Sequence, residues 1–231
     1  MSEKPILFNT AMVRAIMSGK KTQTRRIAFK AEDLTEFKHA MYPEGMWYKG
    51  RVYKNMDDFL RDRQIPKCRY KAGDMLYVRE TWKQATVGTA GPGLIDLYLY
   101  KADEPQDTTG MMVEGRWHPS IHMPKEAARI WLKVTNVRCE RLQDMDEDDA
   151  YYEGFRGCPH ELALYFKDGS AEPCHVSGEG CPCDYWYCNH SPQEGFGRDI
   201  WDKTIKPDDL PHYGWDANPW VWAIEFERVE R

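Results

Sequence analysis

The residues best suited to chemistry lie in a basic segment near the N-terminus, with the spacing Gly19-x-Lys21-x-x-Thr24-x-Arg26. A lysine acts as a general base or nucleophile only when burial or cationic neighbours lower its pKa. The neighbouring cations are Lys20, Arg25 and Arg26. A neutral Lys21 could deprotonate the Thr24 hydroxyl three residues further on. The spacing therefore predicts a base and a nucleophile in one turn, against the plainer alternative of a solvated basic turn.

A carboxylate that could hold this lysine or carry a proton stands at Glu80. It falls near the end of the apolar run Met75–Trp82, which we predict to be a strand. The alternative is that Glu80 pairs with Arg79 or another surface base.

A second cluster of chemically capable residues follows residue 157, where five of the seven cysteines and four of the seven histidines lie. The spacing C-x6-C-x-C-x4-C offers four thiolates to a tetrahedral zinc, and this stretch has few aliphatic residues for a core. The predicted zinc ligands are Cys174, Cys181, Cys183 and Cys188. Possible substitutes are Cys158, His160, His175 and His190. The alternative is a loop of reduced cysteines.

The elements that must position these residues are short. Apolar periodicity predicts a helix over 11–18, capped by Asn9 or Thr10 and ended by Gly19. Strands are expected at 6–8, 75–82, 94–101, 130–140 and 219–229, with a short acidic helix at 142–154. Helical structure is also expected at 56–63 and 196–205. This mixed order favours a small α+β fold, a mixed β-barrel with peripheral helices, over a doubly wound sheet.

Composition narrows the functional classes. The 231 residues carry a net charge of -5, and no apolar run is long enough to span a bilayer, so we expect a cytoplasmic protein without a membrane partner. Residues 1–80 hold 17 basic and 10 acidic residues, so the acidic average hides a basic N-terminal third. No phosphate loop, dinucleotide fingerprint or nucleophile elbow occurs, and we expect no organic cofactor.

Taken together, these motifs resemble the ASCH domain family, a branch of the PUA-like β-barrels, in its longer phage and prophage form. Beside the basic motif, the matching segments are Gly73-Asp74-Met75-Leu76-Tyr77-Val78-Arg79-Glu80, Trp117-x-Pro119-Ser120-Ile121-x-Met123-Pro124, Arg141-Leu142-Gln143-Asp144, Ala150, Glu153-Gly154 and the last strand. The resemblance implies a single domain over 1–231, with insertions at about 31–69 and 156–215.

The resemblance also implies a site that faces nucleotides or RNA. Some bacterial members remove the acetyl group from 4-acetylcytidine with a Lys, a Thr and a Glu, which correspond here to Lys21, Thr24 and Glu80. The residues expected to bind the nucleotide are Lys20, Arg26, Trp117, His118 and Ser120. Two alternatives remain open: a non-catalytic RNA-binding module, and a phage accessory or morphogenesis protein.

Overall fold

A computed structural model of the chain describes residues 3–30, 34–37, 45–62, 65, 67–88, 94–104, 111–113, 115–155 and 191–230. The chain divides into two compact units. Unit 1 comprises residues 1–24, 70–137 and 224–231, and unit 2 comprises residues 25–69 and 138–223. The two predicted insertions, 31–69 and 156–215, both fall within the residue ranges of unit 2.

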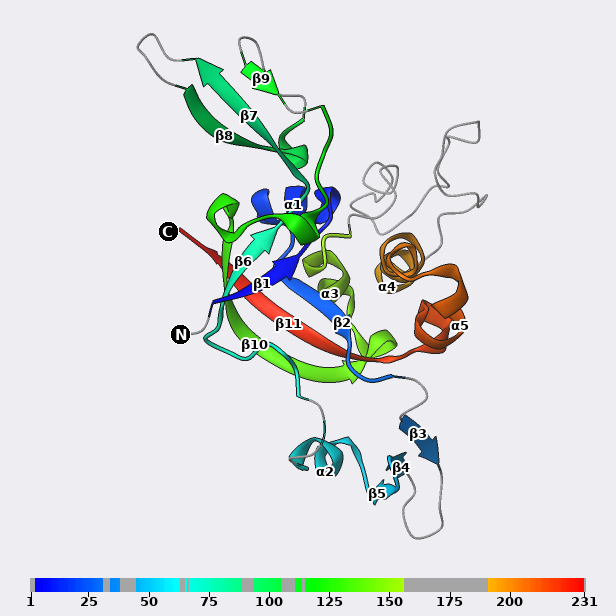
Figure 1. Cartoon of the computed structure of the whole chain (residues 1–231). Coiled ribbons are helices and arrows are strands. Elements are labelled where there is room, and N and C mark those ends of the chain that lie inside the picture. Colours follow the sequence, from blue (N-terminus) through cyan, green and yellow to red (C-terminus); the bar gives the residue numbers. More distant parts are fainter. Residues whose placement is uncertain are drawn as a thin grey trace, which may run out of the picture. The chain divides into compact units, whose positions relative to one another are not determined.

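Figure 1 labels the strands and the α-helices. The strands are β1 (Glu3–Leu7), β2 (Gln23–Ile27), β3 (Leu34–Phe37), β4 (Gly45–Tyr48), β5 (Arg51–Tyr53), β6 (Met75–Arg79), β7 (Trp82–Gly88), β8 (Leu94–Tyr100), β9 (Met111–Val113), β10 (Trp131–Arg141) and β11 (Trp220–Val229). The helices are α1 (Thr10–Met17), α2 (Met56–Arg61), α3 (Glu147–Tyr152), α4 (Pro192–Phe196) and α5 (Leu210–Tyr213). Two 3₁₀ turns matter below: η1 (Lys101–Asp103) and η2 (Ser120–His122).

The largest sheet has the strand order β1-β6-β10-β11-β2, with β1 parallel to β6 and β6 antiparallel to β10. Two three-stranded sheets, β3-β4-β5 and β8-β7-β9, accompany it. The fold is therefore mixed α+β with a core made mostly of sheet, as predicted. The expected closed barrel is not formed by the described strands, because β1 and β2 stand at opposite edges of the order.

Local sequence signals account for α1. The Asn9 side chain accepts the N–H of Met12 as an N-cap, and Val13 and Ile16 form the buried face. This confirms the predicted helix over 11–18, with Asn9 rather than Thr10 as its cap. The predicted strand 75–82 is wrong at its end: β6 ends at Arg79, and Trp82 begins the separate strand β7.

Each unit has its own apolar packing. In unit 1, Ile6 of β1 lies opposite Val78 of β6, and the Phe8 and Phe226 rings are 6.1 Å apart. In unit 2, the fully buried Phe59 of α2 lies at the centre of an aromatic cluster. Its ring meets those of Phe29, Tyr48 and Tyr53 edge-on, at 5.0–5.3 Å. Among the described residues, no helix is both long and apolar enough to cross a membrane.

Candidate active site

Lys21 is buried because the chain reverses directly after α1. Gly19 has φ +70°, a left-handed conformation that glycine adopts without strain. The N–H groups of Lys20 and Lys21 both donate to the Ala15 carbonyl, at 2.8 and 3.0 Å. Lys20 is left exposed, while only 2% of Lys21 is accessible. The Lys21 Nζ lies 5.9 Å from the centre of the Phe8 ring.

The other two predicted catalytic residues are also buried in unit 1. Thr24 in β2 is 2% exposed, and Glu80, directly after β6, is 1% exposed. The Phe8 N–H donates to the Arg79 carbonyl at 3.2 Å, so Phe8 contacts both the Lys21 amine and the residue before Glu80. Lysine and glutamate are rarely buried to this degree unless they are paired, and such groups cluster at functional sites. This region is therefore the candidate active site.

The Glu80 carboxylate is bound by Arg129, a residue that the sequence motifs did not indicate. Arg129 Nε donates to Glu80 Oε1 at 3.0 Å, and Nη2 donates to Oε2 at 3.1 Å. The same guanidinium binds Asp103 through Nη1 and Nη2, at 2.6 and 2.9 Å. Its carbon lies 3.9 Å from the centre of the Tyr100 ring. Arg129 therefore bridges two carboxylates in a stacked, planar arrangement that lysine could not reproduce.

Helix α1 also supports the Asp103 end of this arrangement. Arg14 Nε donates to the Ala102 carbonyl at 2.7 Å, and its Nη2 donates to the Glu104 carbonyl at 3.2 Å. These bonds satisfy carbonyls in and after η1, the turn that carries Asp103. Arg129 Nη2 also lies 3.7 Å from the sulfur of Met17, the last residue of α1. Helix α1 therefore leads to Lys21 and also fixes η1, the turn whose Asp103 binds Arg129.

Burial and charge act in opposite directions on Glu80. Removal from water raises the pKa of Glu80, while the hydrogen bonds and charge of Arg129 lower it and the charge of Asp103 raises it. Burial alone would lower the pKa of Arg129, but its bonds to Glu80 and Asp103 raise it overall. Burial raises the pKa of Tyr100 to about 12, so its hydroxyl stays protonated and donates to the Ala127 carbonyl at 2.7 Å.

Two of the predicted nucleotide-binding residues lie just beyond Glu80. His118 and Trp82 exchange backbone hydrogen bonds of 2.7 and 3.2 Å, and their rings are 4.9 Å apart and inclined by 30°. Trp117 lies beneath two amines, Lys83 Nζ at 4.3 Å and Lys101 Nζ at 5.2 Å from its ring centre. Aromatic faces beside cations can stack bases and attract phosphates.

The third residue of this loop, Ser120, begins η2, and its carbonyl accepts the N–H of Met123 at 3.1 Å. The Met123 sulfur in turn accepts the Glu80 N–H at 3.2 Å. The loop that carries Trp117, His118 and Ser120 is thus connected to the backbone of the buried glutamate. The Trp82 indole N–H is buried and has no hydrogen-bond partner among the described residues.

The basic segment does not act as one group. Arg25 and Arg26 belong to unit 2, whereas Lys20, Lys21 and Thr24 belong to unit 1. Arg25 has a fully buried side chain that contacts Glu140 at 2.6 Å, Asp149 at 2.8 Å and Glu153 at 3.3 Å. Its charge is thus used in ion pairs of unit 2. Arg26 is half-buried in β2.

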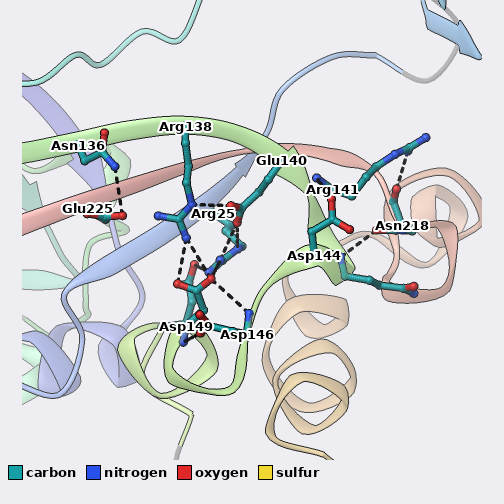
Figure 2. A network of polar contacts seen from close by, with 12 residues as sticks. Arg25, Asn136, Arg138, Glu140, Arg141, Asp144, Asp146, Asp149, Asn218 and Glu225 are labelled. Carbon is teal, nitrogen blue, oxygen red and sulfur yellow. Dashed lines mark hydrogen bonds and ion pairs between the residues drawn. The ribbon is translucent and has the colours of Figure 1, made fainter. Parts of the chain in front are cut away.

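Figure 2 shows this carboxylate network in unit 2. Arg138 joins it through Glu140 at 2.5 Å and Asp149 at 2.9 Å. Asp146 caps α3 by accepting the N–H of Asp149 at 2.7 Å, as the predicted acidic helix start requires. Asp149 is therefore an ion-pair partner as well as part of a helix start.

The four predicted zinc ligands, Cys174, Cys181, Cys183 and Cys188, lie outside the described residues, as do their substitutes Cys158, His160, His175 and His190. In the part of the chain that the structure describes, no three His, Cys, Asp or Glu side chains gather as a metal site. The described cysteines, Cys68 and Cys139, are not joined in disulfides.

Arg129 and Asp103 are the site residues that sequence reasoning missed. Arg129 is separated from Glu80 by 49 residues and from Asp103 by 26, so no local spacing connects them. The available signal was a lone arginine directly before the predicted strand 130–140. Comparison of the chain with protein-family models, with curated proteins and with solved structures gave no match.

Proposed function

We propose that this chain is an ASCH-like protein that acts on a nucleotide or RNA base, by amide hydrolysis of an acetylated cytidine with Lys21, Thr24 and Glu80. The observation that carries the proposal is the burial of all three side chains in one unit, with Glu80 bound by Arg129. Burial disfavours the charged form of an amine, and amide hydrolysis needs a neutral lysine.

The proposed reaction has two stages, transfer of the acetyl group to Thr24 and hydrolysis of the resulting ester, and Lys21 carries the proton in both. The Thr24 oxygen attacks the acetyl carbonyl carbon while its proton passes to the neutral Lys21 amine. The amide C–N bond then breaks, and the exocyclic nitrogen of cytosine leaves with the proton that Lys21 returns. Lys21 then takes a proton from water, and the water oxygen attacks the carbonyl carbon of the Thr24 ester. The bond between the Thr24 oxygen and the acetyl group breaks, Lys21 returns the proton to the Thr24 oxygen, and acetate leaves. Ionised Glu80 stabilises Lys21 while the amine carries the proton.

The test is an assay in which conversion of 4-acetylcytidine to cytidine and acetate is monitored by chromatography. Lys21→Met and Thr24→Val remove the reacting groups with little change of shape, and Glu80→Gln removes the charge. Each should lower turnover by a factor on the order of 10² to 10⁴, the usual contribution of a positioned acid, base or nucleophile.

The matched control is Lys71→Met, because Lys71 is an exposed lysine outside the predicted site. It should keep wild-type turnover, and circular dichroism should show that all four variants fold. A wild-type protein that releases no acetate, or a folded Lys21→Met variant with full turnover, would overturn the proposed reaction.

A second candidate function is RNA binding without chemistry. The observation that favours it is the pair of amines over Trp117, together with the neighbouring rings of Trp82 and His118, which are 4.9 Å apart. Such a surface suits a single strand, whose bases stack while cations track the phosphates. Binding of RNA by a wild-type protein that shows no turnover would favour this function over hydrolysis.

The zinc-stabilised insertion belongs to the same proposal. Cys174, Cys181, Cys183 and Cys188 would supply the four thiolates of a closed structural site. In this role the metal orders the insertion and takes no part in the reaction.

A further inference from the structure

We infer that Arg129, held by Asp103, is a positioning residue that fixes the Glu80 carboxylate for its work on Lys21. The inference rests on the proposed function of Glu80. It concerns a residue that touches neither the substrate nor the reacting atoms, and that acts through Glu80.

The geometry restricts Glu80 at both its ends. The side chain donates nothing and accepts one Arg129 N–H on each oxygen, at 3.0 and 3.1 Å. Its backbone N–H is bound by the Met123 sulfur at 3.2 Å. A carboxylate oxygen has two acceptor sites, and the bonds to Arg129 occupy one site on each oxygen. The arginine therefore sets the orientation of the carboxylate.

Asp103 gives Arg129 a second anchor at its more accessible side. The Asp103 side chain is 32% exposed, Arg129 is 25% exposed and Glu80 only 1% exposed. The three form a series from solvent to the interior, in which the outer carboxylate aligns the guanidinium and the guanidinium aligns the inner carboxylate. Stacking on Tyr100 at 3.9 Å removes the remaining freedom of the guanidinium plane.

The two supporting residues act on Glu80 with opposite signs. Asp103 is the further titratable group that acts on both Glu80 and Arg129. Tyr100, whose ring lies against the Arg129 guanidinium, is itself affected by Arg129, Glu80, Tyr98 and Asp103. Arg129 lowers the pKa of Glu80 and Asp103 raises it. If the reaction needs ionised Glu80, turnover falls as pH drops through that pKa. Loss of Arg129 should then move the acidic limb to higher pH, and loss of Asp103 should move it to lower pH.

The experiment measures two quantities in Arg129→Gln and Asp103→Asn: the pH profile of turnover, and the titration of Glu80 itself. Carbon NMR of glutamate-labelled protein gives the second, with the Glu80 signal identified by its loss in Glu80→Gln. In Arg129→Gln the midpoint should rise by at least about one pH unit, the usual effect of a bound opposite charge. In Asp103→Asn it should fall, by less, because Asp103 is further out.

Arg129→Lys keeps the charge but loses the planar pair of bonds to Glu80. The Glu80 midpoint of this variant should therefore stay nearer the wild-type value than that of Arg129→Gln, while turnover should fall in both variants. Arg116→Gln, at an exposed arginine, is the control and should change neither quantity. A merely structural Arg129 would lower thermal stability and leave the Glu80 midpoint unchanged, which would overturn the inference. So would midpoints that move the same way in both variants.

The titration needs no substrate, so failure of this inference and failure of the proposed reaction are distinguishable. If Arg129→Gln does not fold, Asp103→Asn decides the question alone, because it removes only the more exposed carboxylate. A midpoint that rises or stays unchanged in Asp103→Asn would then refute the arrangement.

Discussion

Replacement of Arg25 by methionine should cost unit 2 far more stability than the loss of an ordinary surface charge. The Arg25 side chain is fully buried and contacts Glu140, Asp149 and Glu153. Methionine fills a similar space but leaves these carboxylates without that guanidinium. Removing one partner of a buried ion pair usually lowers the free energy of unfolding by about 3 to 5 kcal/mol.

The structure places this variant near the lower end of that range. Arg138 still contacts Glu140 and Asp149, so two of the three carboxylates keep a cation. We therefore expect a loss of about 3 kcal/mol. For a chain of this length, that corresponds to a fall of roughly 6 to 12 °C in melting temperature.

Urea unfolding followed by tryptophan fluorescence would measure the loss, with Lys133→Met as the control. Lys133 pairs with Glu227 on the surface at 3.1 Å, with both side chains about half exposed, and should lose less than about 1 kcal/mol. Salt should weaken the control's effect and barely change that of Arg25→Met, since buried pairs are poorly screened. Equal losses of unfolding free energy in the two variants would show that the buried network stabilises unit 2 no more than a surface ion pair does, and would refute the prediction.

Protein purified without added metal should contain about one equivalent of zinc by elemental analysis, and replacement of Cys181 and Cys183 by serine should remove it; a fully folded, metal-free protein would end that proposal. Binding of a single-stranded RNA should weaken steeply as salt rises and weaken again in Trp117→Ala, whereas an affinity independent of salt would exclude a phosphate-binding surface. Burial raises the pKa of Cys139 to about 12, so alkylation of its thiol should be slow at pH 8, rise with pH up to that value and become fast on unfolding; rapid alkylation of native protein at pH 8 would contradict the burial.

Local signals were sufficient for elements whose ends carry a cap or a glycine. Asn9 and Gly19 bracket α1, as the sequence indicated, and Asp146 caps α3 within the acidic helix expected at 142–154. The division between β6 and β7 was not predictable in this way. Met75–Val78 and Trp82 favour strand, so the run looks continuous in the sequence, but the break falls at Glu80, whose N–H and carboxylate bind Met123 and Arg129.

The candidate site was predictable only for residues that belong to a motif. Lys21, Thr24 and Glu80 stand in short segments with recognisable spacing. Arg129 and Asp103 do not, because their roles depend on how distant segments meet. The charge of a residue also did not predict its role within the basic motif. Arg25 and Arg26 are both arginines, yet Arg25 is buried against carboxylates that lie 115 to 128 residues away in the sequence.

The eight-residue helix α1 has a consequence for how activity would be lost on warming. Its C-terminal turn directs Lys21 inward, and Arg14 within it holds η1, which carries Asp103. A helix this short is marginal by itself and depends on its tertiary contacts. Transient fraying of α1 would release the amine and the carboxylate support in the same event. Hydrogen exchange of the α1 amides should therefore report the integrity of the whole site, and heat could inactivate the protein by local opening well below its global melting point.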